Sequence, residues 1–294
     1  MPTQSVDPRT GDPFGPVLED TSPAGLDEVV RAASQAAEGW ADATAAMRSV
    51  ALGTIADRLE AAADELVPLA DRETGLGVPR LTGELARTTF QLRMFATAVE
   101  QDTVTGTLVD PEVAGPPPSG HPELRRMLVP VGPVAVYGAS NFPFAFSVPG
   151  GDTASALAAG CPVVVKAHPA HPQTSAATAA LVAAALDAVG APTGTFGIVH
   201  GYDAGRLLVQ HPAIRAAAFT GSYGGGRALF DLAVGRPDPI PFYGELGSVN
   251  PVVVTPGGLP RASPSQSRTS TLLRWVPASS APTLGCCWSR SAPG

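Results

Sequence analysis

The sequence predicts an α/β fold built on a parallel sheet. The second half of the chain contains apolar runs of only three or four residues, at 127–129, 134–136, 163–165, 196–199 and 216–219. Alanine-rich segments of helical length separate them, at 154–159, 174–189, 204–209 and 224–234. Short strands alternating with helices are typical of βαβ units, whose strands run parallel. A last strand is expected at 251–254.

The first hundred residues predict packing helices that precede the sheet. Residues 1–20 look extended and rich in turns, and Thr21 or Ser22 can cap a helix that covers about 26–40. A longer helix is expected at 45–69, because apolar residues recur there at spacings of three and four. Gly75 should stop it. A third helix is expected at 81–99.

Composition excludes several classes of protein. A net charge of −7 over 294 residues argues against a nucleic-acid surface. The sequence contains no run of about 18 apolar residues, so no membrane span is predicted. The first residues lack the pattern of a signal peptide, and a cytoplasmic protein is therefore expected. The three cysteines and five histidines show no metal-ligand spacing, so no metal site is expected. Cys161 precedes an apolar run and is interpreted as a small buried hydrophobe.

The stretch 131–146 carries the first chemical signal. Its apolar run breaks at Gly138 and is followed by Ser140 and Asn141. α/β proteins place their chemistry where strands end, and an Asn amide can donate to an oxygen that becomes negative during a reaction. Taken alone, a simple turn would explain Gly and Asn equally well.

Further motifs follow in an order that resembles one family. They are Val163-Val-Val-Lys166, Phe219-Thr-Gly-Ser222, Gly244-Glu-Leu-Gly247 and Asn250-Pro251. With them, the chain resembles the aldehyde dehydrogenase superfamily, from about the N-terminus to residue 255. Four phrases resemble its NADP-linked branch, which acts on α-ketoglutaric semialdehyde (2,5-dioxopentanoate) and fatty aldehydes: Tyr137-Gly-Ala-Ser-Asn-Phe-Pro143, Gly151-Asp-Thr-Ala-Ser155, Lys166-Ala-His-Pro-Ala-His-Pro172 and Arg236-Pro-Asp-Pro-Ile-Pro241.

The resemblance implies an activity and two catalytic residues. The family oxidises small aldehydes to carboxylic acids with NAD(P)⁺ through a cysteine thioester; in the intact enzyme the aldehyde would be 2,5-dioxopentanoate and the product 2-oxoglutarate. Asn141 matches the donor that holds the oxyanion, and Glu245 matches the base that activates the hydrolytic water.

The resemblance also implies a Rossmann-type cofactor domain. Lys166 would reach a phosphate or ribose hydroxyl, although a lysine at the end of a strand can also simply extend into solvent. Pro169 stands where NAD-preferring relatives carry an acidic residue, so NADP is expected, with NAD still possible. His168 could line the ribose pocket or only shape a His-Pro turn. The remaining expected cofactor contacts are Ser140, Thr220, Gly221, Ser222, Gly226 and Leu246.

The chain is expected to divide into a cofactor-binding portion, 1–255, and an unrelated, disordered tail, 256–294. Residues 275–289 can be back-translated so that another reading frame encodes Gly-Gln-Phe-Cys, as in the family's nucleophile motif, which suggests a frameshift. The family's catalytic domain, its nucleophilic cysteine and the arm that forms its homo-oligomers are then absent. The chain as written would be inactive; the alternative is a nucleotide-binding fragment or a pseudoenzyme.

Overall fold

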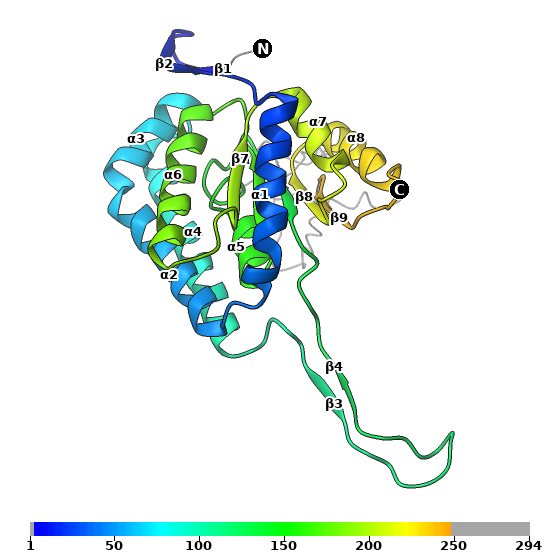
Figure 1. The fold of residues 1–294 in the computed structure, drawn as a ribbon. Coiled ribbons are helices and arrows are strands. Elements are labelled where there is room, and N and C mark those ends of the chain that lie inside the picture. The colour runs from blue at the N-terminus through cyan, green and yellow to red at the C-terminus, as the bar shows by residue number, and fades with distance from the viewer. Residues whose placement is uncertain (1–2, 248–294) are drawn as a thin grey trace, which may run out of the picture.

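A parallel sheet lies at the centre of the computed structural model, which describes residues 3–247 (Figure 1). Its five strands run in the order β7-β6-β5-β8-β9. They are β5 (Val134–Tyr137), β6 (Val163–Lys166), β7 (Phe196–Val199), β8 (Ala216–Thr220) and β9 (Phe242–Glu245). Every neighbouring pair is parallel, so the predicted fold class is confirmed.

The order of the strands creates a switch point at β5. The chain moves outward from β5 through β6 to β7, and then returns to place β8 and β9 on the other side. In open α/β sheets, ligands bind in the crevice outside the carboxyl ends of the strands at such a point. The loops that follow β5 and β8 are therefore the natural place for a site.

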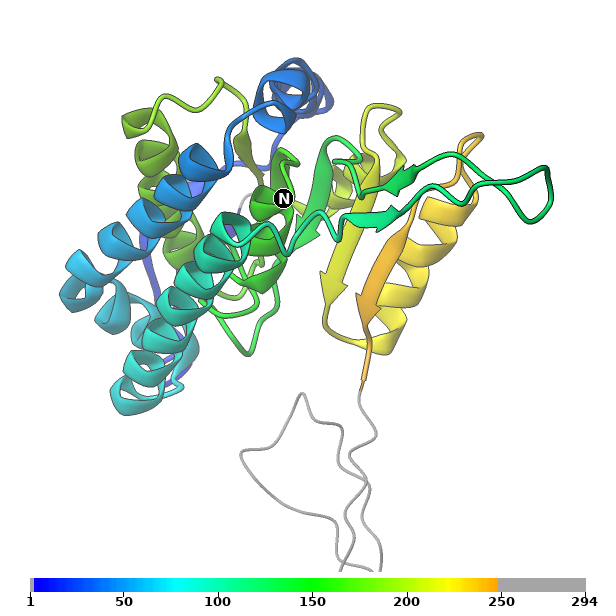
Figure 2. The ribbon, with the colours of Figure 1, turned by 90° about the horizontal axis from the view of Figure 1, so that it is seen from below.

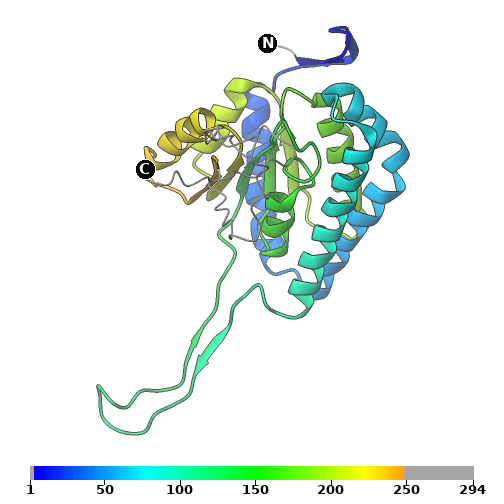
Figure 3. The ribbon, with the colours of Figure 1, turned by 180° about the vertical axis from the view of Figure 1, so that it is seen from behind.

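Helices cover both faces of the sheet (Figures 1 and 3). Because side chains alternate along a strand, Val134 and Val136 of β5 enter one core, and Ala135 and Tyr137 enter the other. The second core lies under α1 (Pro23–Ala41), α7 (Tyr202–Gln210) and α8 (Tyr223–Val234). The first lies under α2 (Ala45–Ala61), α3 (Ala63–Thr74), α4 (Val78–Glu100), α5 (Gly151–Ala158) and α6 (Pro172–Ala188).

The N-terminal helices follow the sequence prediction, with one correction. Ser22 caps α1 by accepting a hydrogen bond from the N–H of Gly25, and Gly75 ends α3 with a φ of 67°. The single helix expected at 45–69 is two helices, α2 and α3, which separate at Ala62.

A buried glutamate ties three of these elements together. Glu73 of α3 is only 4% exposed and accepts hydrogen bonds from the N–H groups of Gln173 (2.9 Å) and Thr174 (2.8 Å) in the first turn of α6. It also accepts the hydroxyls of Thr174 and of Ser5. Ser5 belongs to β1 (Thr3–Val6), which pairs antiparallel with β2 (Pro13–Leu18) in the stretch expected to be extended. Glu73 thus replaces a local cap for α6 and anchors the N-terminal hairpin.

Two features of the sheet region differ from the sequence prediction. The strand expected at 127–129 is absent: the strands here are β3 (Leu108–Asp110) and β4 (Leu124–Arg126), an exposed antiparallel ribbon that projects from the body (Figures 1 and 3). Residues 127–129 lie at the base of this ribbon and are exposed. Their apolar side chains line a cavity, which is described below, and do not belong to the sheet. In addition, β9 was not expected, because its Gly244 and preceding prolines resemble a turn. The strand expected at 251–254 lies outside the described residues.

Candidate active site at the carboxyl edge of the sheet

The loop after β5 carries Asn141 at the switch point. Ser140 is exposed and Asn141 is half-buried. The loop begins with Ala139, whose N–H donates to Phe146 O (2.7 Å) and whose carbonyl accepts from Nε2 of His171 (2.8 Å). The backbone carbonyl of Asn141 accepts a hydrogen bond from Arg80 of α4 (2.8 Å). Asn141 is therefore held in a folded loop, not at the end of a free turn.

Lys166 ends β6 beside Tyr137, the last residue of β5. Its side chain is half-buried, and α7 passes so close that an added Cβ on Gly205 would lie 3.2 Å from the Cγ of Lys166. Burial lowers the pKa of the Lys166 ammonium, and the carboxylate of Asp20 opposes that shift. The lysine is thus a partly desolvated cation at the sheet edge, which favours binding of an anion over a purely solvent-exposed role.

The turn after Lys166 contains two histidines with different surroundings. His171 is fully buried: its Nε2 donates to Ala139 O and its Nδ1 accepts from the hydroxyl of Ser175 (3.1 Å). Burial lowers its pKa, so it is a neutral structural group. His168 stacks on it, with ring centroids 5.6 Å apart, and accepts the N–H of Ala170 (3.1 Å). Burial and the nearby His171 and Lys166 lower the pKa of His168 to about 3, so it brings no positive charge to the edge at neutral pH.

The β8–α8 connection gathers the other expected cofactor residues. Thr220 ends β8, Gly221 follows it, and Ser222 caps α8 by accepting the N–H of Gly225 (3.3 Å). The first N–H groups of a helix have no acceptor within the helix, and this end is positively polarised. The connection therefore presents donors suited to a phosphate.

Gly226 and Leu246 contact each other, which the sequence could not show. A Cβ on Gly226 would overlap Cδ2 of Leu246. Because this position lacks a side chain, the residue that follows β9 packs directly on the first turn of α8 (Figure 2 shows α8 beside β8 and β9). Gly226 and Leu246 together form one side of the candidate site at the carboxyl edge of the sheet.

Glu245 closes the edge at the end of β9. It pairs with Thr220, its carbonyl accepts the N–H of Gly221 (3.1 Å), and it is exposed. Asp152, in the first turn of α5, faces it: burial and the negative charge of Glu245 raise the pKa of the Asp152 carboxyl. The two carboxyl groups thus lie in unlike surroundings, since Asp152 is partly buried and Glu245 is exposed.

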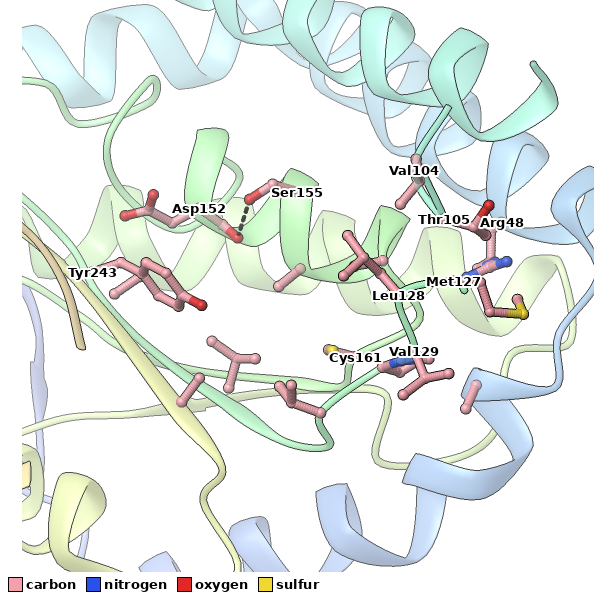
Figure 4. A pocket seen from close by; sticks show the side chains of 18 of the residues that line it. Arg48, Val104, Thr105, Met127, Leu128, Val129, Asp152, Ser155, Cys161 and Tyr243 are labelled. Carbon is pink, nitrogen blue, oxygen red and sulfur yellow. Dashed lines mark hydrogen bonds between the residues drawn. The ribbon is translucent and has the colours of Figure 1, made fainter. Parts of the chain in front are cut away.

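A cavity of about 850 Å³ extends from Asp152 along one side of the sheet. Asp152 and Tyr243 lie at one end, and Arg48 and Met127 lie at the other (Figure 4). Its walls are mainly apolar and include Val134, Cys161, Ala216, Ala218 and the segment 127–131. Sequence reasoning did not single out Asp152; the only signal was its place in the phrase Gly151-Asp-Thr-Ala-Ser155.

The described residues offer one thiol and no metal cluster. Cys161 is 3% exposed at the entrance to β6, as predicted for a buried hydrophobe. No group of three His, Cys, Asp or Glu side chains within 3–247 could hold a metal ion. Nor does any helix in this range have the length and apolarity to cross a membrane.

The fold and the site together define a class: an α/β protein with a Rossmann-ordered sheet and polar groups at its carboxyl edge. The chain belongs to the aldehyde dehydrogenase family, whose model matches residues 2–258. This confirms the resemblance drawn from the motifs.

Named relatives and solved structures agree. The chain is 44% identical over 259 residues to α-ketoglutaric semialdehyde dehydrogenase 2 of Azospirillum brasilense, and 43% identical over 256 residues to α-ketoglutaric semialdehyde dehydrogenase of Acinetobacter baylyi. Each match covers 87% of this chain and 49% of the relative, so the chain spans about half the length of these relatives. An NAD-dependent benzaldehyde dehydrogenase from Corynebacterium glutamicum superposes with a TM-score of 0.72 at 25% identity, over 84% of this chain and 51% of that one.

Proposed function

We propose that the whole protein oxidises an aldehyde to a carboxylic acid with NADP, through a cysteine thioester, and that its substrate is 2,5-dioxopentanoate, which becomes 2-oxoglutarate. The observation that carries the proposal is the convergence of Asn141, Lys166 and Glu245 on one edge of a Rossmann-ordered sheet. The substrate is supported by the likeness to two α-ketoglutaric semialdehyde dehydrogenases, which are 44% and 43% identical to this chain.

Two residues carry the proposed chemistry within the described part. The amide N–H of Asn141 stabilises the oxyanion that forms when a thiolate attacks the aldehyde; removal of such a donor costs roughly 10²–10³-fold in rate. Glu245, exposed and facing the buried Asp152, accepts a proton from the water that hydrolyses the thioester. The carboxyl group of Asp152 lies near enough to Glu245 to feel its charge.

The residues at the edge fit a nucleotide. Lys166 supplies a cation, and the start of α8 supplies N–H donors for phosphate. Bound NADP would supply the hydride acceptor. Pro169 is exposed where an acidic side chain would repel a 2′-phosphate, and His168 stands next to it as a neutral ring. Ser140, Thr220 and the Gly226–Leu246 contact complete the proposed pocket.

The nucleophile does not come from the described part. Cys161 is buried at the entrance to β6, at the edge opposite Lys166. We assign 1–255 to the cofactor-binding portion and 256–294 to a frameshifted tail, and the end of the family match at residue 258 supports this boundary. The buried state of Cys161 also favours the second candidate function, a nucleotide-binding fragment without turnover.

The cofactor is tested by calorimetry on the full chain. NADP should bind more tightly than NAD, and Pro169→Asp should reverse that order because the new carboxylate repels the 2′-phosphate. Pro169→Ala is the matched control, since it removes the proline without adding charge. A preference for NAD in the unmodified chain would contradict the assignment.

Turnover is tested with 2,5-dioxopentanoate. The 294-residue chain should not oxidise it, whereas a version with the reading frame restored after about residue 257 should. In the restored version, Glu245→Gln should slow steady turnover and spare the first burst of NADPH, and Asn141→Ala should slow the burst. Turnover by the unrestored chain that Cys286→Ser or Cys287→Ser abolishes would refute the frameshift.

A further inference from the structure

We propose that Glu84 and Arg80 of α4 are positioning residues for Asn141. This inference rests on the role proposed above for Asn141 as the oxyanion donor. The two residues lie one turn apart on the same face of α4, and that face lies against the loop after β5.

The contacts reach the loop at two points. Nη2 of Arg80 donates to the backbone carbonyl of Asn141 (2.8 Å), and its guanidinium lies 5.1 Å from the ring centroid of Phe142. Oε1 of Glu84 accepts the N–H groups of Phe144 (2.8 Å) and Ala145 (3.0 Å). The polypeptide between 141 and 145 is thereby attached to a long helix at both of its ends.

The other side of the loop is attached to a different element. His171, at the start of α6, donates to Ala139 O, and the N–H of Ala139 donates to Phe146 O. Asn141 therefore lies between an attachment to α6 and an attachment to α4. The α4 contacts thus hold the loop on the side of Asn141 away from Ala139.

Glu84 acts through one oxygen and does not need its charge. The residue is 6% exposed, and within 3–247 its Oε2 is buried without a hydrogen-bond partner. Burial raises the pKa of the Glu84 carboxyl, while the two N–H donors and the nearby Arg80 and Arg87 oppose that shift. A glutamine, which keeps one carbonyl-type oxygen, can accept both N–H groups equally well. A purely steric role predicts no such distinction between Gln and Ala.

Accurate placement matters because an oxyanion donor must lie 2.7–3.1 Å from the position where the charge develops. A site that is loose by about 1 Å loses much of that stabilisation. The α4 contacts supply the second layer of hydrogen bonds that holds Asn141 in one orientation.

The chain offers an unusually direct probe, since it contains only two asparagines, Asn141 and Asn250. Labelling the full chain with [¹⁵N]asparagine gives two side-chain NH₂ signals, and Asn250→Asp assigns them. We expect Glu84→Ala and Arg80→Ala to move the Asn141 signal toward that of free asparagine. Glu84→Gln should leave it in place. Thr88→Val is the matched control: it removes a buried hydroxyl one turn further along α4 that bonds only within the helix.

The outcomes separate the inference from the function beneath it. An Asn141 signal unchanged in Glu84→Ala, moved equally by Glu84→Gln, or moved equally by Thr88→Val would overturn the positioning role. If Glu84→Ala does not fold, Arg80→Ala decides alone, because Arg80 is exposed and outside the core. Added NADP should also shift the Asn141 signal. Failure of that shift would count against the cofactor assignment while the comparison of variants stands.

Discussion

Two buried glutamates should lose very different amounts of stability when each is replaced by glutamine. Glu73 uses both oxygens: one accepts from Ser5 and Gln173, and the other accepts twice from Thr174. In Glu73→Gln, an NH₂ group must face one of these pairs, which leaves two buried donors unsatisfied at about 1–3 kcal/mol each. Loss of a negative charge at the start of α6 adds roughly 0.3–1 kcal/mol. We expect a loss of about 2–7 kcal/mol. Glu84→Gln replaces an oxygen that bonds to nothing described and should cost less than about 1 kcal/mol.

Thermal unfolding followed by circular dichroism at pH 7 measures the difference. For a domain of this size, about 1 kcal/mol corresponds to roughly 2–4 °C, so Glu73→Gln should melt roughly 4–28 °C lower. Glu84→Gln should stay within a few degrees of the unmodified chain. Equal melting temperatures for the two variants would refute the claim that the number of oxygens in use decides the cost.

Two further predictions concern acid stability and backbone packing. The folded pKa values of His168 and His171 lie below the usual 6.5. At a pH between the folded and unfolded pKa values, the unfolded chain therefore binds more protons than the folded chain. The unfolding free energy should then fall as the pH drops below about 6.5. Urea midpoints from pH 7.5 to 4.5 should show this, with a shallower slope in His168→Asn; equal slopes would contradict it. Gly194 has a φ of 98°, and an added Cβ would lie 2.5 Å from the carbonyl carbon of Ala32 in α1. Gly194→Ala should therefore melt well below Gly190→Ala, which shares a positive φ but meets nothing within 4 Å; similar melting temperatures would show that the clash is relieved.

The sequence predicts the sheet well, because its signal is local. Four of the five strands and all the helices between them fall where short apolar runs alternate with alanine-rich segments. What fails is set by tertiary context. Residues 127–129 look like a strand but form a cavity wall, and β9 exists because β8 offers it a parallel partner.

The candidate site divides in the same way. Family motifs predict roles for Asn141, Lys166 and Glu245, because each motif can be read from a short local stretch of sequence. Nothing near Glu84 in the sequence connects it to Phe144, sixty residues later, so its contact with the loop could only come from the fold. The burial of Asp152 beside Glu245 is likewise a product of how α5 packs against the sheet.

The projecting ribbon formed by β3 and β4 offers a place where the chain can be cut or divided. Every residue of β3 and β4 is exposed, as is nearly every residue of the turn between them, 111–123. The segments on either side, 3–107 and 127–247, contribute jointly to the larger core, with α2 packed on α6 and α4 packed on α5. A single protease cut in the turn would thus leave two peptides still bound to each other by their shared apolar surface. The same turn is where the gene could be divided into two separately expressed halves, or where a tag could be inserted, without disturbing Asn141 or the edge that it serves.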